Sequence, residues 1–187
     1  MTFAGRRPGG KVRFMLWKLR LLWYRADKAA LAFALFFASL VGALVFAFTL
    51  VSAHRDAQAA SVRDLHARSL DCLARNVYYE ARGEPSAGQY AVAEVTMNRK
   101  ALPRYPKTVC EVVYQKEAFS WTGLGVLEPP AGDAWRRAVR VAEDVYYQRR
   151  PRTLQPSVTH FHATYVSPDW SGEKQRVARI GRHVFYR

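Results

Sequence analysis

The stretch LARNVYYEARGEPSAGQYAVAEVTMNRK, residues 73–100, predicts two helices separated by a sharp break. Apolar side chains recur at helical spacing before the break, which predicts a first helix from about Ser69 to Arg82. Gly83 can adopt the left-handed conformation that commonly ends a helix, and Pro85 disfavours helical geometry at the residue before it. A helix, a break and a second helix therefore open the globular part of the chain.

The rest of the chain predicts helices first and strands afterwards. Ser86 and Gln89 fit a capping box, so the second helix should begin there and run to about Lys100. The stretch YPKTVCEVVYQ then predicts a short helix and DAWRRAVRVAEDVYYQRR a long one. By contrast, SVTHFHATYV and RVARIGRHVFYR alternate as strands do, with Gly181 at a bulge or bend. Helices followed by a small antiparallel sheet predict a mostly helical α+β fold for residues 69–187.

The chain before this domain predicts a membrane anchor. Residues 1–28 carry eight of the 29 Lys and Arg side chains and a single acid, and residues 29–53 carry no charge. As a helix this uncharged run reaches about 37 Å, which exceeds the roughly 30 Å of a bilayer's hydrocarbon core. Residues 51–53, Val-Ser-Ala, resemble the cleavage site of a signal peptide, but the apolar run is far longer than such peptides use. We therefore expect an uncleaved transmembrane helix after a basic cytoplasmic tail.

The charge pattern also predicts orientation and partners. Positive residues flank the N-terminal end of the apolar run, so the N-terminus should stay cytoplasmic and the C-terminal domain should cross the lipid bilayer. Residues 54–68 are polar and rich in alanine, and we interpret them as a stalk. The net charge of +14 suits an anionic partner, such as lipid headgroups or an acidic polymer. Nucleic acid is not an expected partner, because export removes the domain from the nucleoid.

The two cysteines of the chain, Cys72 and Cys110, both follow the apolar run. An even number of cysteines in an exported domain predicts a disulfide bond between them. Closing this loop would contribute roughly 4 kcal/mol of stability in the chain-entropy model. The alternative is two unpaired thiols that are buried as small apolar side chains. A zinc site would need more ligands than these two residues supply.

Glu80 is the candidate catalytic residue that the helical spacing singles out. It lies about 80–90° from the centre of the apolar stripe of the first helix, at the border of that stripe. Partial burial there favours the neutral carboxyl and raises its pKa, as a general acid requires. Arg82 projects away from Glu80 around the helix, and the break after Gly83 separates Glu84 from it. The alternative is a structural acid bonded to backbone or to an arginine.

Five motifs in order resemble the cell-wall hydrolase family typified by the SleB-type spore-cortex-lytic enzymes. They span residues 73–187 and are LARNVYYEARGEPSAGQYAVAEVTMNRK, YPKTVCEVVYQ, FSWTG, THFHATYVSPDW and RIGRHVFYR. Two positions depart from the family's usual pattern: Glu117-Ala118 precede the Phe-Ser-Trp motif where glutamine is common, and Asp169 stands where a second proline is usual. These departures concern contacts to the substrate rather than the class of reaction.

The resemblance implies a lysozyme-like α+β fold and an activity. The glutamate that matches Glu80 would be the catalytic acid of a lytic transglycosylase or muramidase that cuts peptidoglycan glycan strands. In the lytic reaction one carboxyl group gives a proton to the glycosidic oxygen and then takes one from the C6 hydroxyl of the muramic residue. No second carboxylate, cofactor or metal is then expected. An inner-membrane anchor, together with this resemblance, predicts a domain that faces the periplasm.

Sugar-binding sites combine aromatic walls with polar groups, and the motifs contain both kinds of residue. The candidate walls are Tyr79, Trp121, Tyr165 and Trp170, and the candidate polar groups are Ser120, Thr122 and His183. A structural role is the alternative for each, because buried aromatic side chains mostly pack. Asn98, which matches an Asn-Arg pair of the family, is expected to cap the end of its helix.

Two other functions remain open from the sequence. His160 and His162 alternate onto one face of a predicted strand and His183 lies on another, so three imidazoles could bind zinc in a wall amidase or peptidase. The alternative for these histidines is hydrogen bonding within the sheet. A membrane-tethered module that binds the wall without chemistry would also fit the positive charge of the exported part.

Overall fold

The computed structural model describes residues 15, 17–18, 20–21, 23–24 and 27–187. These described residues form two compact units, one that ends at residue 59 and one of residues 60–187. The basic tail predicted for residues 1–28 therefore lies largely outside the described residues. Helix α2 runs without interruption over Lys28–Ala81. It begins long before Ser69, where the sequence predicted the first helix of the domain to start, because residues 54–82 contain neither glycine nor proline to stop it.

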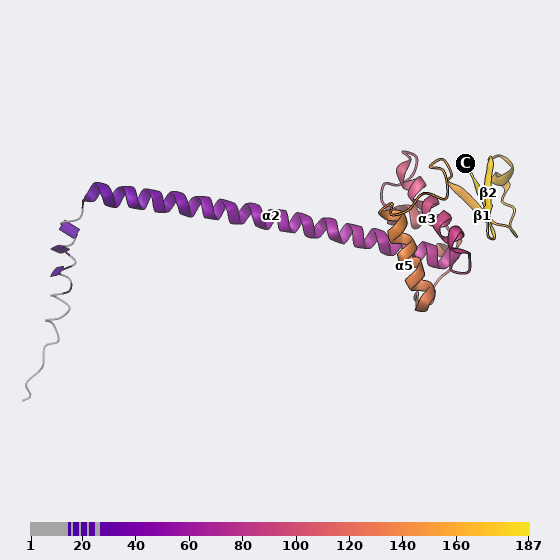
Figure 1. Cartoon of the computed structure of the whole chain (residues 1–187), viewed down its shortest axis with the longest axis horizontal. Helices are drawn as coiled ribbons and strands as arrows, with labels where there is room; N and C mark the ends of the chain where they lie inside the picture. Colours follow the sequence, from indigo (N-terminus) through magenta and orange to yellow (C-terminus); the bar gives the residue numbers. More distant parts are fainter. Residues whose placement is uncertain (1–14, 16, 19, 22, 25–26) are drawn as a thin grey trace, which may run out of the picture. The chain divides into compact units, whose positions relative to one another are not determined.

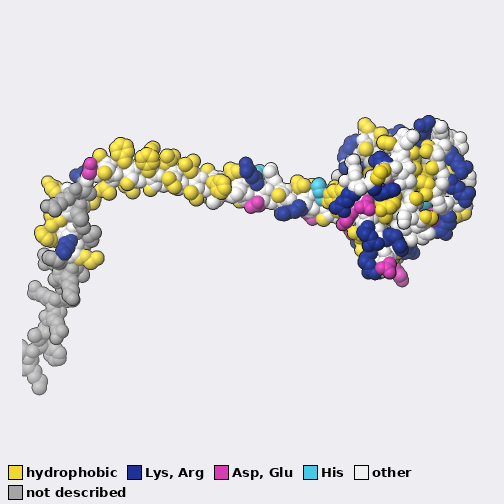
Figure 2. Space-filling view, in the orientation of Figure 1, with side chains coloured by type: hydrophobic (Ala, Val, Ile, Leu, Met, Phe, Trp, Pro, Cys, Tyr) yellow, Lys and Arg dark blue, Asp and Glu magenta, His cyan; other side chains and the backbone are white. Residues whose placement is uncertain are grey.

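The N-terminal half of α2 carries the apolar run, and Figure 2 shows its surface covered by hydrophobic side chains. Helix α2 is long and apolar enough to cross a membrane, and none of its most apolar stretch is buried. An N-terminal signal sequence can also form a long apolar helix, so the uncleaved anchor stays a prediction. The predicted stalk, residues 54–68, is a helical part of α2 in which Arg68 pairs with Asp64 one turn away.

The second unit combines helices with one small sheet, as the α+β prediction requires (Figure 1). Helix α3 contacts α4, α5 and β2. The three strands are antiparallel in the order β1-β3-β2, with β3 in the middle. The elements after α2 are α3 (Ser86–Ala101), α4 (Val109–Val113), the 3₁₀ turn η1 (Ser120–Gly123), α5 (Gly132–Tyr146), β1 (His160–Ala163), the 3₁₀ turn η2 (Asp169–Gly172), β2 (Arg176–Ile180) and β3 (His183–Tyr186).

The break between α2 and α3 differs in detail from the sequence prediction. Gly83 does not adopt a left-handed conformation, and an added Cβ there would meet the guanidinium of Arg182 at 3.1 Å. The capping box predicted at Ser86 is also wrong, because Ser86 is already helical and Gln89 donates instead to the carbonyl of Glu84. Gly181 is not a bulge or bend within one strand as predicted: it lies in the tight turn that divides this stretch into the antiparallel strands β2 and β3. Its φ is +57°, and a Cβ there would collide with the carboxylate of Glu84.

Helix α3 separates two hydrophobic clusters. The larger cluster joins α2, α3, α4, α5 and η1, and it includes Leu73, Val77, Ala93 and Val141. The smaller cluster joins the other face of α3 to the sheet, with Phe185 of β3 fully buried against Val92 and Val95. A helix that serves two cores is buried along nearly its whole length, so its polar side chains must find partners inside the protein.

Those polar side chains hold the segment that leads into β1. Glu94 accepts the backbone N–H groups of Thr153 and Leu154. Asn98 donates to the carbonyls of Gln155 and Val158 at 2.9 and 2.8 Å. Asn98 therefore does not cap the end of its own helix as expected; it binds a segment that is distant in sequence.

The predicted disulfide bond is confirmed. Cys72 of α2 and Cys110 of α4 are bonded, with their Cα atoms 5.3 Å apart. The bridge ties the short helix α4 to the C-terminal part of α2, next to the larger cluster.

Replacement of Asn98 by alanine should destabilise the domain. Asn98 is 2% exposed, and its loss leaves the part-buried carbonyl of Gln155 and the buried carbonyl of Val158 without these donors. We expect the free energy of unfolding to fall by about 2–4 kcal/mol. Urea unfolding of the full chain in detergent micelles, followed by tryptophan fluorescence, measures the change. Arg137→Ala on the exposed face of α5 is the control, and a loss from Asn98→Ala as small as that of the control would contradict this role.

Candidate active site

A cavity of about 310 Å³ lies where the end of α2 meets η1 and the sheet. Residues from four places converge on it: the last turn of α2, the approach to η1, strand β1 with the loop after it, and the start of β3. Glu80 is the one acid among the described residues that line it. The lining is Tyr79, Glu80, Ala118, Phe119, Ser120, Phe161, His162, Ala163, Tyr165, Val166 and His183.

Glu80 lies one residue before the end of α2, and its carboxyl group is largely removed from solvent. Its Oε1 atom is buried, and no hydrogen bond from the described residues reaches it. Burial raises the pKa of Glu80, while the Ser120 hydroxyl, the positive charge of Arg99 and the backbone N–H groups at the start of η1 act in the opposite direction. The raised pKa agrees with the sequence prediction. Arg82 is not its partner, since its guanidinium lies 4.9 Å from the centre of the Tyr78 ring.

The two other acids near the break are used for structure. Glu84 is 8% exposed and accepts both the backbone N–H and the Nε of Arg182 at 2.8 Å. Burial opposes ionisation of Glu84, but these two hydrogen bonds, with the positive charge of Arg182, outweigh it and lower its pKa. Glu94 is bound to backbone N–H groups and lies 3.6 Å from Arg150. Glu80 differs from both because its buried Oε1 accepts no hydrogen bond from the described residues.

Four of the other predicted site residues share the cavity with Glu80: Tyr79, Ser120, Tyr165 and His183. Tyr79 donates its hydroxyl to the carbonyl of Glu128 and stacks on Trp121, so its ring is fixed. Tyr165 is 84% exposed at the rim. His183 is buried with no hydrogen-bond partner for its Nδ1 among the described residues, and burial lowers its pKa. It therefore enters the site as a neutral imidazole at pH 7.

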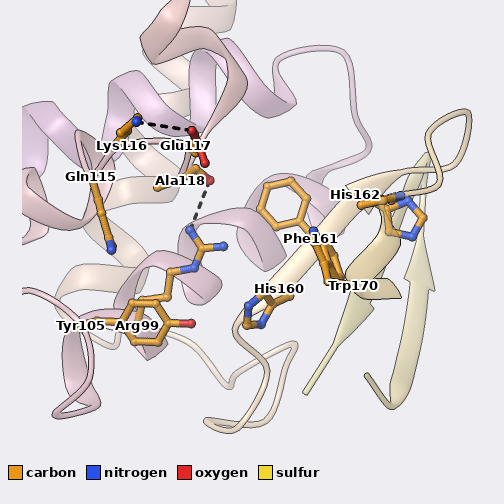
Figure 3. A pocket seen from close by; sticks show the side chains of 11 residues that line it. Arg99, Tyr105, Gln115, Lys116, Glu117, Ala118, His160, Phe161, His162 and Trp170 are labelled. Atoms are coloured by element: carbon orange, nitrogen blue, oxygen red, sulfur yellow. Dashed lines mark hydrogen bonds and ion pairs between the residues drawn. The ribbon is translucent and has the colours of Figure 1, made fainter. Parts of the chain in front are cut away.

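The structure places the three remaining candidates outside this cavity. Trp121 belongs to the larger hydrophobic cluster and donates its indole N–H to Asn76 at 2.9 Å. Thr122 lines a neighbouring cavity of about 420 Å³. Trp170 lines another neighbour of about 450 Å³, where its ring lies against His160 and His162 (Figure 3). The three cavities share lining residues around the segment 116–120, so they form one interrupted groove.

The three histidines proposed for the zinc alternative do not converge. In the antiparallel register, His162 pairs with Val184 and Ala163 pairs with His183. Directly opposed residues share a face of the sheet, so His183 lies on the face opposite to His160 and His162. His162 instead accepts or donates a hydrogen bond at the Tyr186 hydroxyl. Within the described part of the chain, no three His, Cys, Asp or Glu side chains are grouped to hold a metal ion.

Sequence reasoning missed several residues that line the groove. Phe161, Val166 and Ala118 close the cavity around Glu80, and Arg99 lines its larger neighbour. Their placement depends on the long-range approach of β1 to the helices, which no local spacing encodes. One signal was available: Arg99 follows the apolar stretch Ala91–Ala93 and Val95 of α3, and a charged residue in a helix that is buried needs a buried partner or a ligand.

Comparisons with known proteins agree with this fold. A model of the cell wall hydrolase family matches residues 83–186, a range that begins just after Glu80. The spore cortex-lytic enzyme of Bacillus subtilis is 31% identical over 60% of this chain and 35% of its own length. That of Halalkalibacterium halodurans is 32% identical over 62% of this chain and 34% of its own length. The chain thus spans about a third of these curated relatives.

A solved structure shares the arrangement of the elements. The catalytic domain of the germination-specific lytic transglycosylase SleB from Bacillus anthracis superposes with a TM-score of 0.53 at 26% identity. The superposition covers 64% of this chain and 93% of that domain. The resemblance drawn from the five sequence motifs is confirmed, and so is the mostly helical α+β fold with a small antiparallel sheet.

Glu80→Gln should stabilise the chain at neutral pH. A carboxyl group whose pKa is raised by folding binds protons more tightly in the folded state, so stability is lost as pH rises from about 4.5 through the raised pKa. Glutamine does not ionise and removes this loss. We expect the melting temperature of the variant to exceed that of the wild type by a few degrees at pH 7.5, with the difference vanishing near pH 3.

Glu84→Gln is the matched control and should have the opposite sign. The pKa of Glu84 is lowered by folding, so its stabilising effect is present above pH 4.5 and is lost as pH falls through the lowered pKa. This variant should melt below the wild type at pH 7.5. Circular dichroism melts of both variants across pH provide the measurement. A Glu80→Gln variant that is destabilised at pH 7.5, as Glu84→Gln is, would show that Glu80 is a structural acid.

Proposed function

The chain belongs to the cell wall hydrolase family, and on that premise we propose that it is a membrane-anchored peptidoglycan glycosidase. We propose further that it is a lytic transglycosylase, which cuts the bond between N-acetylmuramic acid and N-acetylglucosamine with Glu80 as the single acid and base. The similarity to the SleB domain from Bacillus anthracis, a germination-specific lytic transglycosylase, supports this assignment. So does the chemistry of the groove.

The observation that carries the proposal is the state of Glu80. Its carboxyl group lies in a groove, carries an unbonded buried oxygen and has a raised pKa, so it holds a proton at a pH where exposed carboxyl groups do not. The Ser120 hydroxyl and the N–H groups at the start of η1 favour its ionised form. Both protonation states are therefore accessible, as a group that first gives and then takes a proton requires.

The reaction then follows from one carboxyl group. Glu80 gives its proton to the glycosidic oxygen while the bond from C1 of the muramic residue to that oxygen breaks. The resulting carboxylate takes the proton of the C6 hydroxyl of the same residue, and O6 bonds to C1. The products are a 1,6-anhydromuramic end and an N-acetylglucosamine end with a free 4-hydroxyl, and Glu80 is protonated again. Attack within one sugar residue benefits from proximity and consumes no water.

The neighbouring residues have supporting roles in this proposal. Tyr165 and Phe161 offer ring surfaces to the apolar faces of the sugar, and Ser120 and neutral His183 offer hydrogen bonds to its hydroxyl groups. Trp121 supports the wall indirectly, because Tyr79 stacks on it. Trp170 and Thr122 lie farther along the groove, where they would contact neighbouring sugar residues.

The anchor and the topology are also proposals. We expect α2 to hold the chain in the inner membrane, with the N-terminus cytoplasmic and the domain in the periplasm. Three observations support this: the uncharged run in α2, the basic residues before it, and a disulfide bond that an oxidising compartment favours.

Glu80→Gln should abolish cleavage and leave the fold intact. Removal of a group that acts as both acid and base should lower the rate by roughly 10³-fold or more. Release of soluble muropeptides from purified sacculi by the full chain in detergent micelles, followed by liquid chromatography, measures the rate. Activity within a few fold of the wild type would exclude Glu80 as the acid.

Glu117→Gln is the matched control for this test. Glu117 is the other acid on the groove, where its carboxylate is 84% exposed and 3.8 Å from Lys116. A mechanism with one carboxyl group predicts that this variant cleaves within a few fold of the wild-type rate. A loss comparable to that of Glu80→Gln would instead indicate a pair of carboxyl groups, as in a hydrolytic glycosidase.

Reporter fusions at the C-terminus test the topology. Alkaline phosphatase fused after Arg187 should be active and β-galactosidase inactive, because only the former folds in an oxidising compartment. The mass of the purified chain should still include residues 1–53 if the anchor is not cleaved. An active β-galactosidase fusion would contradict the proposed orientation, and a chain that begins near residue 54 would contradict the anchor.

A further inference from the structure

A second cavity, of about 450 Å³, adjoins the cavity that holds Glu80. The two share Ala118, Phe161 and His162, so a group bound in one lies next to a group bound in the other. One wall comes from α3 and the segments that follow it, and the opposite wall comes from β1 and η2. Figure 3 shows Arg99 and Tyr105 on the first wall, and His160, Phe161 and Trp170 on the second.

Arg99 is a buried cation that forms no ion pair with the described residues, and the carboxyl group of Glu80 acts on its charge only from beyond ion-pair distance. It is 8% exposed, and no carboxylate of the described residues lies within ion-pair distance of it. Its Nε donates to the carbonyl of Thr159 at 2.8 Å and its Nη1 to that of Ala118 at 3.3 Å, both neutral acceptors. Its Nη2 has no hydrogen-bond partner among the described residues. A buried charge of this kind is costly unless a bound anion completes its contacts.

The groups around Arg99 strengthen the positive potential of the cavity. Lys116 lines it, and the charges of Lys174 and Arg104 act on His160. With burial as the main cause, they lower the pKa of His160 to about 4, so this imidazole adds no charge at pH 7. Glu117 is the one acid among the lining residues, and its exposed carboxylate already faces Lys116. The cavity therefore retains a net positive charge.

Uncharged lining residues fit an organic anion better than a bare ion. Tyr105 and Trp170 present rings from opposite walls, and Gln115 presents an amide. The guanidinium of Arg99 lies 5.0 Å from the centre of the Phe119 ring, which fixes its plane. A planar, held guanidinium with free N–H groups matches the geometry of a carboxylate.

We propose that this cavity binds a carboxylate carried by the muramic residue whose bond is cut. The inference rests on the proposed function and names the group that the groove recognises beside the scissile bond. The lactyl arm of muramic acid is attached at C3 of the same sugar ring whose C1 reacts. A ring held against Glu80 can thus extend this arm past Phe161 toward Arg99. The carboxylate belongs either to the bare lactyl arm or to the acidic peptide attached to it.

Three preparations of one peptidoglycan sample separate these sources. Native sacculi carry peptide carboxylates, and sacculi amidated with carbodiimide and ammonia carry none. Glycan strands stripped by an amidase carry only the lactyl carboxylate. The full chain in detergent micelles should cleave the preparation that carries the recognised carboxylate with a kcat/KM about tenfold higher than amidated material. The lactyl carboxyl group of native sacculi is in amide linkage to the peptide. A preference for native material therefore identifies the peptide carboxylate, and a preference for stripped strands alone identifies the lactyl carboxylate.

Variants connect this preference to the cavity. Arg99→Lys keeps the charge but loses the fork of N–H groups, and Lys116→Gln removes a charge at the exposed rim. Both should lower the ratio of kcat/KM for the preferred preparation to that for amidated material severalfold, whereas Arg137→Gln on α5 should leave this ratio unchanged. The ratio is informative because a general defect in folding or in Glu80 lowers both rates together. If Arg99→Lys does not fold, the cleavage ratio measured for Lys116→Gln tests the carboxylate site by itself.

Different results would contradict the carboxylate site and the proposed glycosidase function. Equal cleavage of native, amidated and stripped material by the wild type would overturn the carboxylate site while leaving the glycosidase intact. An unchanged ratio in both cavity variants would overturn it as well. Absence of glycan cleavage in every preparation would overturn the proposed function and this inference together.

Discussion

The hydrogen bonds from α3 to the segment 153–159 are the constraint on which the rest of the domain depends. Glu94, Asn98 and Arg99 are buried polar residues of a helix that packs on both faces, and each binds the backbone of this segment. Because the segment leads directly into β1, these bonds fix where the sheet lies relative to the helices. An unpaired polar group inside the protein costs more than a hydrogen bond contributes, so alternative placements of the strand are strongly disfavoured.

The site follows from that placement. The start of the sheet closes over the end of α2, so Glu80 loses water on one side and faces a groove on the other. Glu84, only one turn away, is bound by Arg182 and keeps a low pKa. Two glutamates of one short stretch thus have opposite electrostatic environments, and that difference separates an acid that can give a proton from an acid that holds the fold. Family membership agrees with the fold, while the role of Glu80 depends on its surroundings.

Local sequence patterns correctly predicted the features that depend mainly on residues close together in the chain. Helical spacing predicted α3 and α5, alternation predicted the stretches that form the strands but not the turn between β2 and β3, and the cysteine count predicted the bond between Cys72 and Cys110. The border position of Glu80 predicted its raised pKa. The errors arose where distant contacts override local preference. Trp121 lies in the core because Asn76 accepts its N–H, and Asn98 binds residues about 60 positions away. The zinc alternative failed on strand register, which sets the face of His183 and is not evident from alternation alone.

The central claim is that Glu80 transfers a proton within one sugar residue and that no water enters the bond. Cleavage of sacculi by the full chain in water enriched in ¹⁸O, with mass spectrometry of the released muropeptides, tests it directly. We predict 1,6-anhydromuramic ends that contain no ¹⁸O. Reducing ends that each carry one ¹⁸O atom would show that water attacks C1, and would contradict the mechanism.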